Sequence, residues 1–150
     1  MKLSHLDERG RARMVDVGGK PESERTAAAE GVVRMSREAF DLVAAQAVEK
    51  GDVLAVAEVA GTMAAKRTGD LIPLCHPLPL SHVEVRIEVG EDAVEIVTVA
   101  ETTAQTGVEM EALVAATIAA LTVYDMAKAI DSSMELSEVR LVEKTKEPVE

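Results

Sequence analysis

Strict alternation of hydrophobic and polar positions marks the middle of the chain. In HVEVRIEVG, residues 82–90, a valine or isoleucine occupies every second position, which predicts a strand with one buried face. VEIVTVAET, residues 94–102, follows the turn Gly90-Glu91-Asp92 and predicts the second strand of a hairpin. Residues 25–35 and 138–144 favour two further strands.

A helical period replaces the alternation in three other stretches. After Ser36, a good N-cap, apolar residues recur at i, i+3, i+4, i+7 and i+8 and predict a helix that ends at Gly51. A second helix is predicted from Asp52 to Gly69. Its apolar stripe consists of Val53, Val56, Val59, Ala60, Met63 and Ala64. A third helix, residues 108–129, is apolar on nearly all sides, which favours complete burial, here against another subunit.

The order of elements is strand, helix, helix, hairpin, helix, strand, with no internal repeat and no linker. It predicts a single α+β domain over residues 1–150, with a mostly antiparallel sheet covered on one face by helices. Residues 1–24 are polar and interrupted by glycines, and we expect them to form a mobile N-terminal arm.

The composition narrows the class of protein. Aromatic residues make up 1% of the 150 residues, so the core must be built from Ala, Val, Leu, Ile and Met. Such small side chains bury little area each, and we expect subunit contacts to add burial. The single Cys excludes an intramolecular disulfide and fits a reducing compartment. Because the N-terminus also lacks an apolar segment, we expect a cytoplasmic protein.

The formal net charge of −11 argues against a nucleic-acid partner, because a duplex requires a basic face. No membrane contact is expected either, since the longest apolar run, near residues 112–124, is short and rich in Ala and Thr. If this acidic chain binds an anion, its few Lys and Arg residues must lie close together at the binding site.

Three of the five prolines, the only cysteine and one histidine share DLIPLCHPLPLS, residues 70–81. The prolines fix φ and remove backbone donors, so this proline loop is predicted to be stiff and extended. Cys75 and His76 are neighbours on an extended chain and should point to opposite sides, which argues against a thiolate–imidazolium pair. Cys75 therefore suits a small apolar filler, while His76 suits a structural hydrogen bond or a ligand contact. No CxxC or HxxxH spacing favours a metal site.

The long helix carries charged residues at both ends. Glu109 and Glu111 in its first turn either complement the helix dipole or form a polar rim, with Met110 as an apolar wall. Asp125 and Lys128 lie side by side near its end, either as a surface ion pair or as a partly desolvated pair suited to proton transfer.

These two groups cannot serve one small ligand within one chain. Glu111 and Asp125 are fourteen residues apart, hence ~21 Å apart along the helix axis. If both are functional, either each chain holds two sites, or two chains pack antiparallel and each site takes one end from each. The apolar middle of the helix favours the second arrangement.

Four basic residues close the predicted helices: Lys50, Lys66, Arg67 and Lys128. Each of them complements a helix C-terminus, or together they form a polyanion site over which Lys20 and Arg25 of the arm close. The Gly-Gly-Lys at residues 18–20 is not a phosphate loop, because the longer pattern ending in Gly-Lys-Ser/Thr is absent.

Several long segments resemble one family. They are MVDVGGK, KGDVLAVAEVAGTMAAKRTGDLIPLCHPLPLS and TGVEMEALVAATIAALTVYDMAKAID, which stand in this order and span most of the chain. Together they are similar to the MoaC family of molybdenum cofactor biosynthesis, the cyclic pyranopterin monophosphate synthases. The resemblance implies a ferredoxin-like α+β fold and a homohexamer, a trimer of dimers with sites between subunits.

The resemblance also implies a lyase reaction. Its substrate is (8S)-3′,8-cyclo-7,8-dihydroguanosine 5′-triphosphate, a GTP-derived nucleotide, and its products are cyclic pyranopterin monophosphate and diphosphate. The overall change is a rearrangement with loss of diphosphate, so no cofactor is expected, and a role for Mg²⁺ beside the triphosphate stays open.

Site residues follow from the matching positions. The resemblance implies catalytic roles for Asp125, Lys128 and Lys50. It implies substrate binding by Leu74, Cys75, His76, Met110 and Glu111, and further site groups at Glu109, Lys66, Arg67, Lys20 and Arg25. Ala104-Gln105 stands where some relatives have Gly-Lys, so no phosphate contact is expected from that position.

The implied mechanism assigns charge to one set of residues and proton transfer to another. Lys66, Arg67 and His76 hold the triphosphate, Asp125 and Lys128 move protons, and Lys50 assists. Two rival classes remain open. A non-catalytic purine-nucleotide-binding oligomeric module would bind without turnover, and a Cys-dependent hydrolase would require Cys75 as nucleophile.

Overall fold

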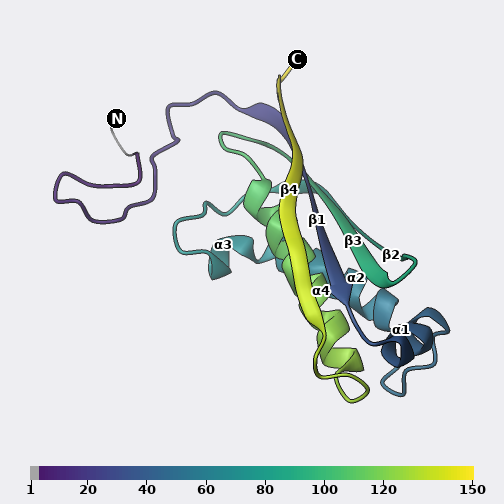
Figure 1. Ribbon diagram of the computed structural model, residues 1–150. Coiled ribbons are helices and arrows are strands. Elements are labelled where there is room, and N and C mark those ends of the chain that lie inside the picture. Colours follow the sequence, from purple (N-terminus) through teal and green to yellow (C-terminus); the bar gives the residue numbers. More distant parts are fainter. Residues whose placement is uncertain (1–3) are drawn as a thin grey trace.

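The computed structural model describes residues 4–150 and contains a four-stranded sheet (Figure 1). Its strands are β1 (Ser23–Arg34), β2 (Leu80–Val89), β3 (Ala93–Ala104) and β4 (Glu135–Pro148). The order across the sheet is β2-β3-β1-β4, and every neighbouring pair is antiparallel. With helical connections after β1 and β3, this is the ferredoxin-like arrangement that the resemblance implied.

Helices cover one face of the sheet, as predicted (Figure 1). They are α1 (Arg37–Ala44), α2 (Val53–Lys66), the single turn α3 (Thr68–Leu71) and α4 (Glu109–Ala127). α4 lies on the central strands, and α2 packs beside it and against β2. α3 begins the proline loop, in a place where the sequence predicted only a helix end.

The core is built from alanine and valine. Ala112, Ala116, Ala119 and Ala120 of α4 are fully buried between the sheet and α2, and Thr98 donates a hydrogen bond to the Ala112 carbonyl at 2.7 Å. The chain itself therefore supplies the burial that the sequence attributed to another subunit. Leu121, 50% exposed, is the large apolar residue of the helix middle that stays uncovered.

α4 is also longer than its central apolar run. Over 19 residues, with a mean hydropathy of 1.4 in its apolar window, it is long and apolar enough to cross a membrane. Half of that window is nevertheless buried inside this chain, as is usual for the core helix of a folded domain.

At Gly61, α2 packs closely on α4. A β-carbon at this position would lie 2.9 Å from the carbonyl oxygen of Ala115 and 3.1 Å from a methyl group of Val85. The first of these atoms belongs to the backbone of α4 and cannot turn aside as the end of a flexible side chain can.

We expect Gly61→Ala to lower the free energy of unfolding by about 1–3 kcal/mol, because overpacking outweighs the helix propensity that alanine adds. Urea denaturation followed by circular dichroism measures this change. Gly19→Ala is the control, since no atom lies within 4 Å of a β-carbon there. Equal stability of the two variants would contradict the tight packing of α2 on α4.

Both predicted N-caps are confirmed. The Ser36 hydroxyl accepts a hydrogen bond from the Ala39 N–H at 3.2 Å, and the Asp52 carboxylate accepts one from the Ala55 N–H at 3.1 Å. Each satisfies a backbone donor that the first helical turn leaves free.

The predicted end of the first helix is wrong. α1 stops at Ala44, and Gln46 takes the left-handed backbone conformation with φ of 54°. The turn brings Val48, 7% exposed, back into the core, so the apolar period continued beyond the helix. Lys50 consequently lies in a loop, where Gly51 (φ 118°) allows the chain to enter α2.

The predicted stripe of α2 is only partly correct. Val56, Val59 and Met63 are 46%, 60% and 48% exposed. The buried face instead consists of Val53, Ala57, Gly61, Ala64 and Ala65. The smallest side chains face α4 because close packing of two helices on one sheet leaves little room, and the larger apolar side chains remain outside.

The arm precedes β1 and contains local structure (Figure 1). Leu6 and Ala12 form a bridge, and the Asp7 carboxylate accepts hydrogen bonds from the Arg9 and Arg11 N–H groups. β1 begins at Ser23, so the strand includes the last residues assigned to the arm. Residues 1–3 lie outside the described part of the chain, and the mobility of the arm stays a prediction.

Candidate active site

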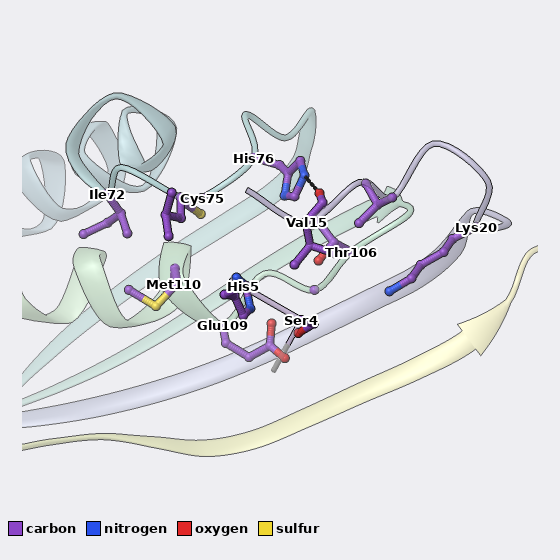
Figure 2. A pocket seen from close by; sticks show the side chains of 13 residues that line it. Ser4, His5, Val15, Lys20, Ile72, Cys75, His76, Thr106, Glu109 and Met110 are labelled. Atoms are coloured by element: carbon purple, nitrogen blue, oxygen red, sulfur yellow. Dashed lines mark hydrogen bonds between the residues drawn. The ribbon is translucent and has the colours of Figure 1, made fainter. Parts of the chain in front are cut away.

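A cavity of about 400 Å³ opens at the N-terminal end of α4 (Figure 2). Three segments that are distant in sequence line it: the arm, the proline loop and the start of α4. The lining residues are Ser4, His5, Val15, Val17 and Lys20; Ile72, Leu74, Cys75 and His76; and Thr106, Gly107, Glu109 and Met110. Six of the implied substrate-binding residues therefore meet in one place.

The proline loop forms one wall of the cavity because it packs tightly on α3. A β-carbon at Gly69 would lie 3.1 Å from the α-carbon of Pro77, so the two backbones are in contact. The Cys75 N–H donates a hydrogen bond to the Ile72 carbonyl at 3.1 Å, which closes a turn. These contacts and the fixed φ of each proline agree with the stiff loop that the sequence predicted.

His76 connects the loop to the arm. Its Nε2 lies 2.7 Å from the carbonyl oxygen of Val15, as Figure 2 shows. A carbonyl oxygen can only accept, so Nε2 carries the hydrogen and Nδ1 stays available to accept a hydrogen bond from a ligand. Of the two roles left open for His76, the structure shows the structural hydrogen bond.

Cys75 contacts an acidic side chain, not a histidine. Its Sγ lies 3.8 Å from Glu111 Oε1, and Glu111 is 2% exposed with no hydrogen-bond partner for Oε2. Burial raises the pKa of the Cys75 thiol, and the nearby Glu111 charge raises it further. Glu111 does not line the cavity itself, but it contacts Cys75, which does.

The Glu111 carboxyl is held in an unfavourable place for a charge. Burial is the main cause of its raised pKa, and the charge of Glu109 adds to it. Hydrogen bonds from its own backbone N–H and from Cys75 act in the opposite direction but do not cancel the effect. A carboxyl of this kind takes up a proton at higher pH than an exposed one.

This raised pKa predicts a pH-dependent stability. A group whose pKa is higher in the folded chain stabilises the fold fully below its ordinary value, 4.5, and loses this contribution as pH rises through the folded value. We expect Glu111→Gln to remove that decline and, near pH 8, to raise the free energy of unfolding by on the order of 1 kcal/mol. Urea denaturation between about pH 4.5 and pH 8 measures how the free energy of unfolding changes with pH. Glu135→Gln, an exposed control on β4, should show the same decline as the wild type. If Glu111→Gln also showed it, the raised pKa of Glu111 would be refuted.

A second cluster lies at the other end of α4. Lys128 Nζ is 3.0 Å from Asp125 Oδ1, and Lys50 Nζ is 2.9 Å from the Asp125 carbonyl oxygen and 4.0 Å from Oδ1. The three residues with implied catalytic roles are thus brought together by the last turn of α4 and the loop before α2. The hydrogen bond from Lys128, with the charges of Lys50 and Lys128, lowers the pKa of Asp125.

Of the two alternatives for Asp125 and Lys128, the chain by itself shows the surface ion pair and not the partly desolvated one. The side chains of Lys50, Asp125 and Lys128 are 46%, 60% and 52% exposed. The long apolar run that precedes them turns its buried faces to the sheet and to α2, so the charged residues stay at the surface. The lowered pKa keeps Asp125 ionised at neutral pH, which suits it to orient two ammonium groups better than to act as a base.

Lys66 and Arg67 do not line the cavity. Lys66 borders a separate hollow of about 470 Å³ with Thr62, Ser81 and His82 near the start of β2. Arg67 is exposed at the junction of α2 and α3. Because α2 runs antiparallel to α4 beside it, both residues nevertheless stand at the same end of α4 as the cavity.

Arg25 borders a third hollow, which adjoins the cavity at Gly107 and Glu109. Lys144 and Lys146 of β4 line this hollow too, and neither was predicted from the sequence to be a site residue. The alternation along β4 could have predicted them, because it places both lysines on the face of the sheet toward α4. Ser4 and His5 were missed because nothing in the arm's polar sequence predicts where it lies.

Metal ligands do not cluster in the part of the chain that the structure describes. Residues 4–150 hold no group of three or more His, Cys, Asp or Glu side chains arranged to bind a metal ion.

The chain was compared with known protein families and sequences. The sequence profile of the MoaC family matches residues 14–147, nearly the whole chain. The chain belongs to the MoaC family. A relative from Thermomicrobium roseum is 57% identical over 145 residues, covering 95% of this chain and 87% of its own. Relatives from Peptoclostridium acidaminophilum and Streptomyces avermitilis are 49% and 54% identical, covering 97% and 96% of this chain and 92% and 85% of their own. All three are named cyclic pyranopterin monophosphate synthase.

The residues that line the cavity fall partly inside and partly outside the range that matches the MoaC family. The matched range includes Val15, Lys20, the proline loop and both ends of α4. Ser4 and His5 precede it, so their side of the cavity lies outside the part that the MoaC profile describes.

Proposed function

We propose that this MoaC-family chain is a cyclic pyranopterin monophosphate synthase, a lyase of molybdenum cofactor biosynthesis. It converts (8S)-3′,8-cyclo-7,8-dihydroguanosine 5′-triphosphate into cyclic pyranopterin monophosphate and diphosphate. The observation that carries this proposal is the cluster of Lys50, Asp125 and Lys128, complete and in hydrogen-bond contact. Asp125 binds Lys128 through its carboxylate and Lys50 through its main-chain carbonyl, and such a cluster favours proton transfer over nucleotide binding alone.

The cavity binds the substrate, and the cluster of Lys50, Asp125 and Lys128 transfers protons. The cavity between the arm and the start of α4 holds the purine-derived ring, with Met110 and Leu74 as apolar contacts and Lys20 as a cation. Lys66 and Arg67, at the same end of α4, bind the triphosphate and stabilise the charge of the leaving diphosphate. His76 presents its free Nδ1 to the ligand while Nε2 holds the arm.

Proton transfer belongs to the second cluster. Asp125 stays ionised and fixes the positions of the Lys50 and Lys128 ammonium groups, which are placed to give up and take back protons as the rings open and close. A ribose-derived hydroxyl attacks the α-phosphorus, the bond to the β-phosphate oxygen breaks, and diphosphate leaves. No cofactor is needed for this rearrangement, and EDTA treatment tests for a contribution of Mg²⁺.

A complete site requires two chains. Glu111 and Asp125 lie at opposite ends of one helix, ~21 Å apart along its axis, so a single ligand cannot contact both clusters of one chain. The outer helical surface carries Val56, Val59, Met63 and Leu121, each about half exposed. We therefore propose a homodimer in which these surfaces meet and α4 of one chain runs antiparallel to α4 of the other. Three such dimers form the homohexamer, which we place in the cytoplasm.

The Cys-dependent hydrolase loses support. The thiol of Cys75 has a raised pKa and contacts a carboxyl, and a nucleophilic cysteine needs the opposite surroundings.

Diphosphate release from the cyclo-dihydroguanosine triphosphate by the purified protein tests the function, with GTP as the control substrate. Turnover of the first and not the second supports the synthase. Tight binding of the first without turnover would overturn the enzyme assignment and leave a nucleotide-binding module.

A further inference from the structure

The first described residues of the arm form a small hairpin, residues 5–13, which ends before the range that matches the MoaC family begins. Its two sides are joined where the Arg13 N–H donates a hydrogen bond to the His5 carbonyl at 2.8 Å. Gly10, with φ of 73°, takes the left-handed conformation in which the chain reverses. The hairpin therefore brings His5 back beside Arg13, close in sequence to the part of the arm that contacts the proline loop.

Asp7 holds the hairpin together. Its Oδ1 accepts hydrogen bonds from the Arg9 N–H at 2.9 Å and from the Arg11 N–H at 2.8 Å, and its Oδ2 pairs with Arg11 Nε at 3.0 Å. The hydrogen bond from the Arg11 backbone is the main cause of the lowered pKa of Asp7, so the carboxylate is ionised at neutral pH. Because an isolated two-stranded hairpin is marginally stable in water, these three contacts are what fixes its turn.

The hydrophobic core does not explain why these residues are folded, because none of residues 4–13 is buried. Two hydrogen bonds hold the next part of the arm over the cavity. One joins His76 Nε2 to the Val15 carbonyl at 2.7 Å, and the other runs from the Gln105 amide to the Gly18 carbonyl at 3.4 Å. The hairpin continues from this anchored segment toward the cavity.

One side of the cavity is supplied by the hairpin. His5 lines it together with Met110 and Ile72 (Figure 2). In the described part of the chain, the ring of His76 is hydrogen-bonded to the protein, whereas the ring of His5 is not. A neutral imidazole carries one donor nitrogen and one acceptor nitrogen, so His5 offers both to a ligand.

We propose that His5 is a ligand-contacting residue, whose imidazole hydrogen-bonds the edge of the purine-derived ring, and that Asp7 is the positioning residue that holds it there. The edge of such a ring carries both donors and acceptors, which an imidazole can match. Met110 and Ile72 beside His5 are apolar, and apolar walls suit a flat ring better than a multiply charged phosphate. The identity of the ligand rests on the proposed function.

Isothermal titration of the purified protein with the cyclo-dihydroguanosine triphosphate measures the contact. His5→Ala should weaken binding about five- to tenfold, because one neutral hydrogen bond is lost. His5→Gln should recover most of the affinity, since its amide has a donor and an acceptor. Turnover at saturating substrate should change by less than about twofold, because the loss is one of binding alone. The affinity for inorganic triphosphate, a probe without a ring, should stay that of the wild type.

Asp7→Ala tests the positioning role. It should weaken substrate binding about as much as His5→Ala, because the hairpin no longer holds the imidazole in the cavity. The double variant should bind like His5→Ala alone, since Asp7 acts through His5 and the two losses are not additive. Asp41→Ala is the matched control, because Asp41 also pairs with an arginine four residues away but lies on α1, outside the cavity. In urea denaturation, Asp7→Ala and His5→Ala should unfold like the wild type, because the hairpin is not part of the core.

The outcomes separate this inference from the proposed function. Weaker substrate binding by His5→Ala, with unchanged binding of inorganic triphosphate, supports the ring contact. The same substrate affinity in His5→Ala and the wild type overturns it, and so does an equal loss for both ligands, which would indicate a phosphate contact. Losses that multiply in the double variant overturn the role of Asp7. A wild type that binds no substrate overturns the proposed function, and the ring contact with it.

Discussion

Replacing Lys128 with alanine is expected to reduce the rate of diphosphate release about 10²- to 10⁴-fold, the usual effect of removing a general acid or base. The Lys128 ammonium lies 3.0 Å from the Asp125 carboxylate and has no second anionic partner in the described residues. Its position is therefore fixed by Asp125, and its remaining donors are free for substrate. Substrate affinity should change much less, because the proposed binding contacts come from the cavity residues and from Lys66 and Arg67.

Asp125→Ala should cause a loss of similar size by a different route. Without the carboxylate, Lys128 loses the ion pair that orients it. Lys50 loses the charge 4.0 Å away but keeps its hydrogen bond to the main-chain carbonyl of residue 125. Arg37→Ala is a matched control, because it removes one member of an exposed helical ion pair, with Asp41, at 3.1 Å. Steady-state diphosphate release and substrate titration distinguish lost turnover from lost binding. Full turnover by Lys128→Ala would exclude the proposed role of this lysine.

Mixing two inactive variants should restore activity. Lys128→Ala disables the catalytic cluster and His76→Ala disables the cavity, so each homo-oligomer should have about one hundredth of wild-type turnover or less. In a heterodimer of the two, one of the two sites receives an intact cluster from one chain and an intact cavity from the other. Random assortment makes half of the dimers mixed, so total activity should return to about a quarter of the wild type.

Co-expression of the two variants with different affinity tags, followed by purification through both tags, isolates the mixed oligomers. Mixing Lys128→Ala with Asp125→Ala is the control, since both changes disable the same cluster and no intact site can form. Recovery in the first mixture and not in the second supports sites shared between chains. No recovery in purified mixed oligomers would show that each site is built from one chain.

Much of the fold was predictable because it depends on local patterns. Alternation in β2 and β3 identified the hairpin, and the caps Ser36 and Asp52 marked two helix starts. The end of α1 was not predictable, because Val48 keeps the apolar period while the backbone has already turned at Gln46. The face of α2 was misread for a related reason. Hydrophobicity favoured Val59 and Met63, but the available space selected Ala57 and Gly61.

In the candidate site, too, local features were predictable from the sequence and long-range contacts were not. The proline loop, the first turn of α4 and the pair Asp125–Lys128 were recognisable, since their residue types and spacing are local properties of the chain. The contact between Cys75 and Glu111, the hydrogen bond from His76 to Val15 and the grouping of Arg25 with Lys146 were not. Each joins residues that are distant in sequence, and only the strand order and helix packing bring them together.

The sequence by itself determined most of the helices and strands, the family and the separation of two functional groups along one helix, because periodicity, motifs and the rise per residue need no tertiary contacts. The tertiary structure decided which side chains are buried and which charges meet. It placed Glu111 out of reach of water, left Asp125 exposed and gathered three cations beside Glu109. Burial and charge proximity, which set the pKa of each group, depend on neighbours that the order of residues alone does not reveal.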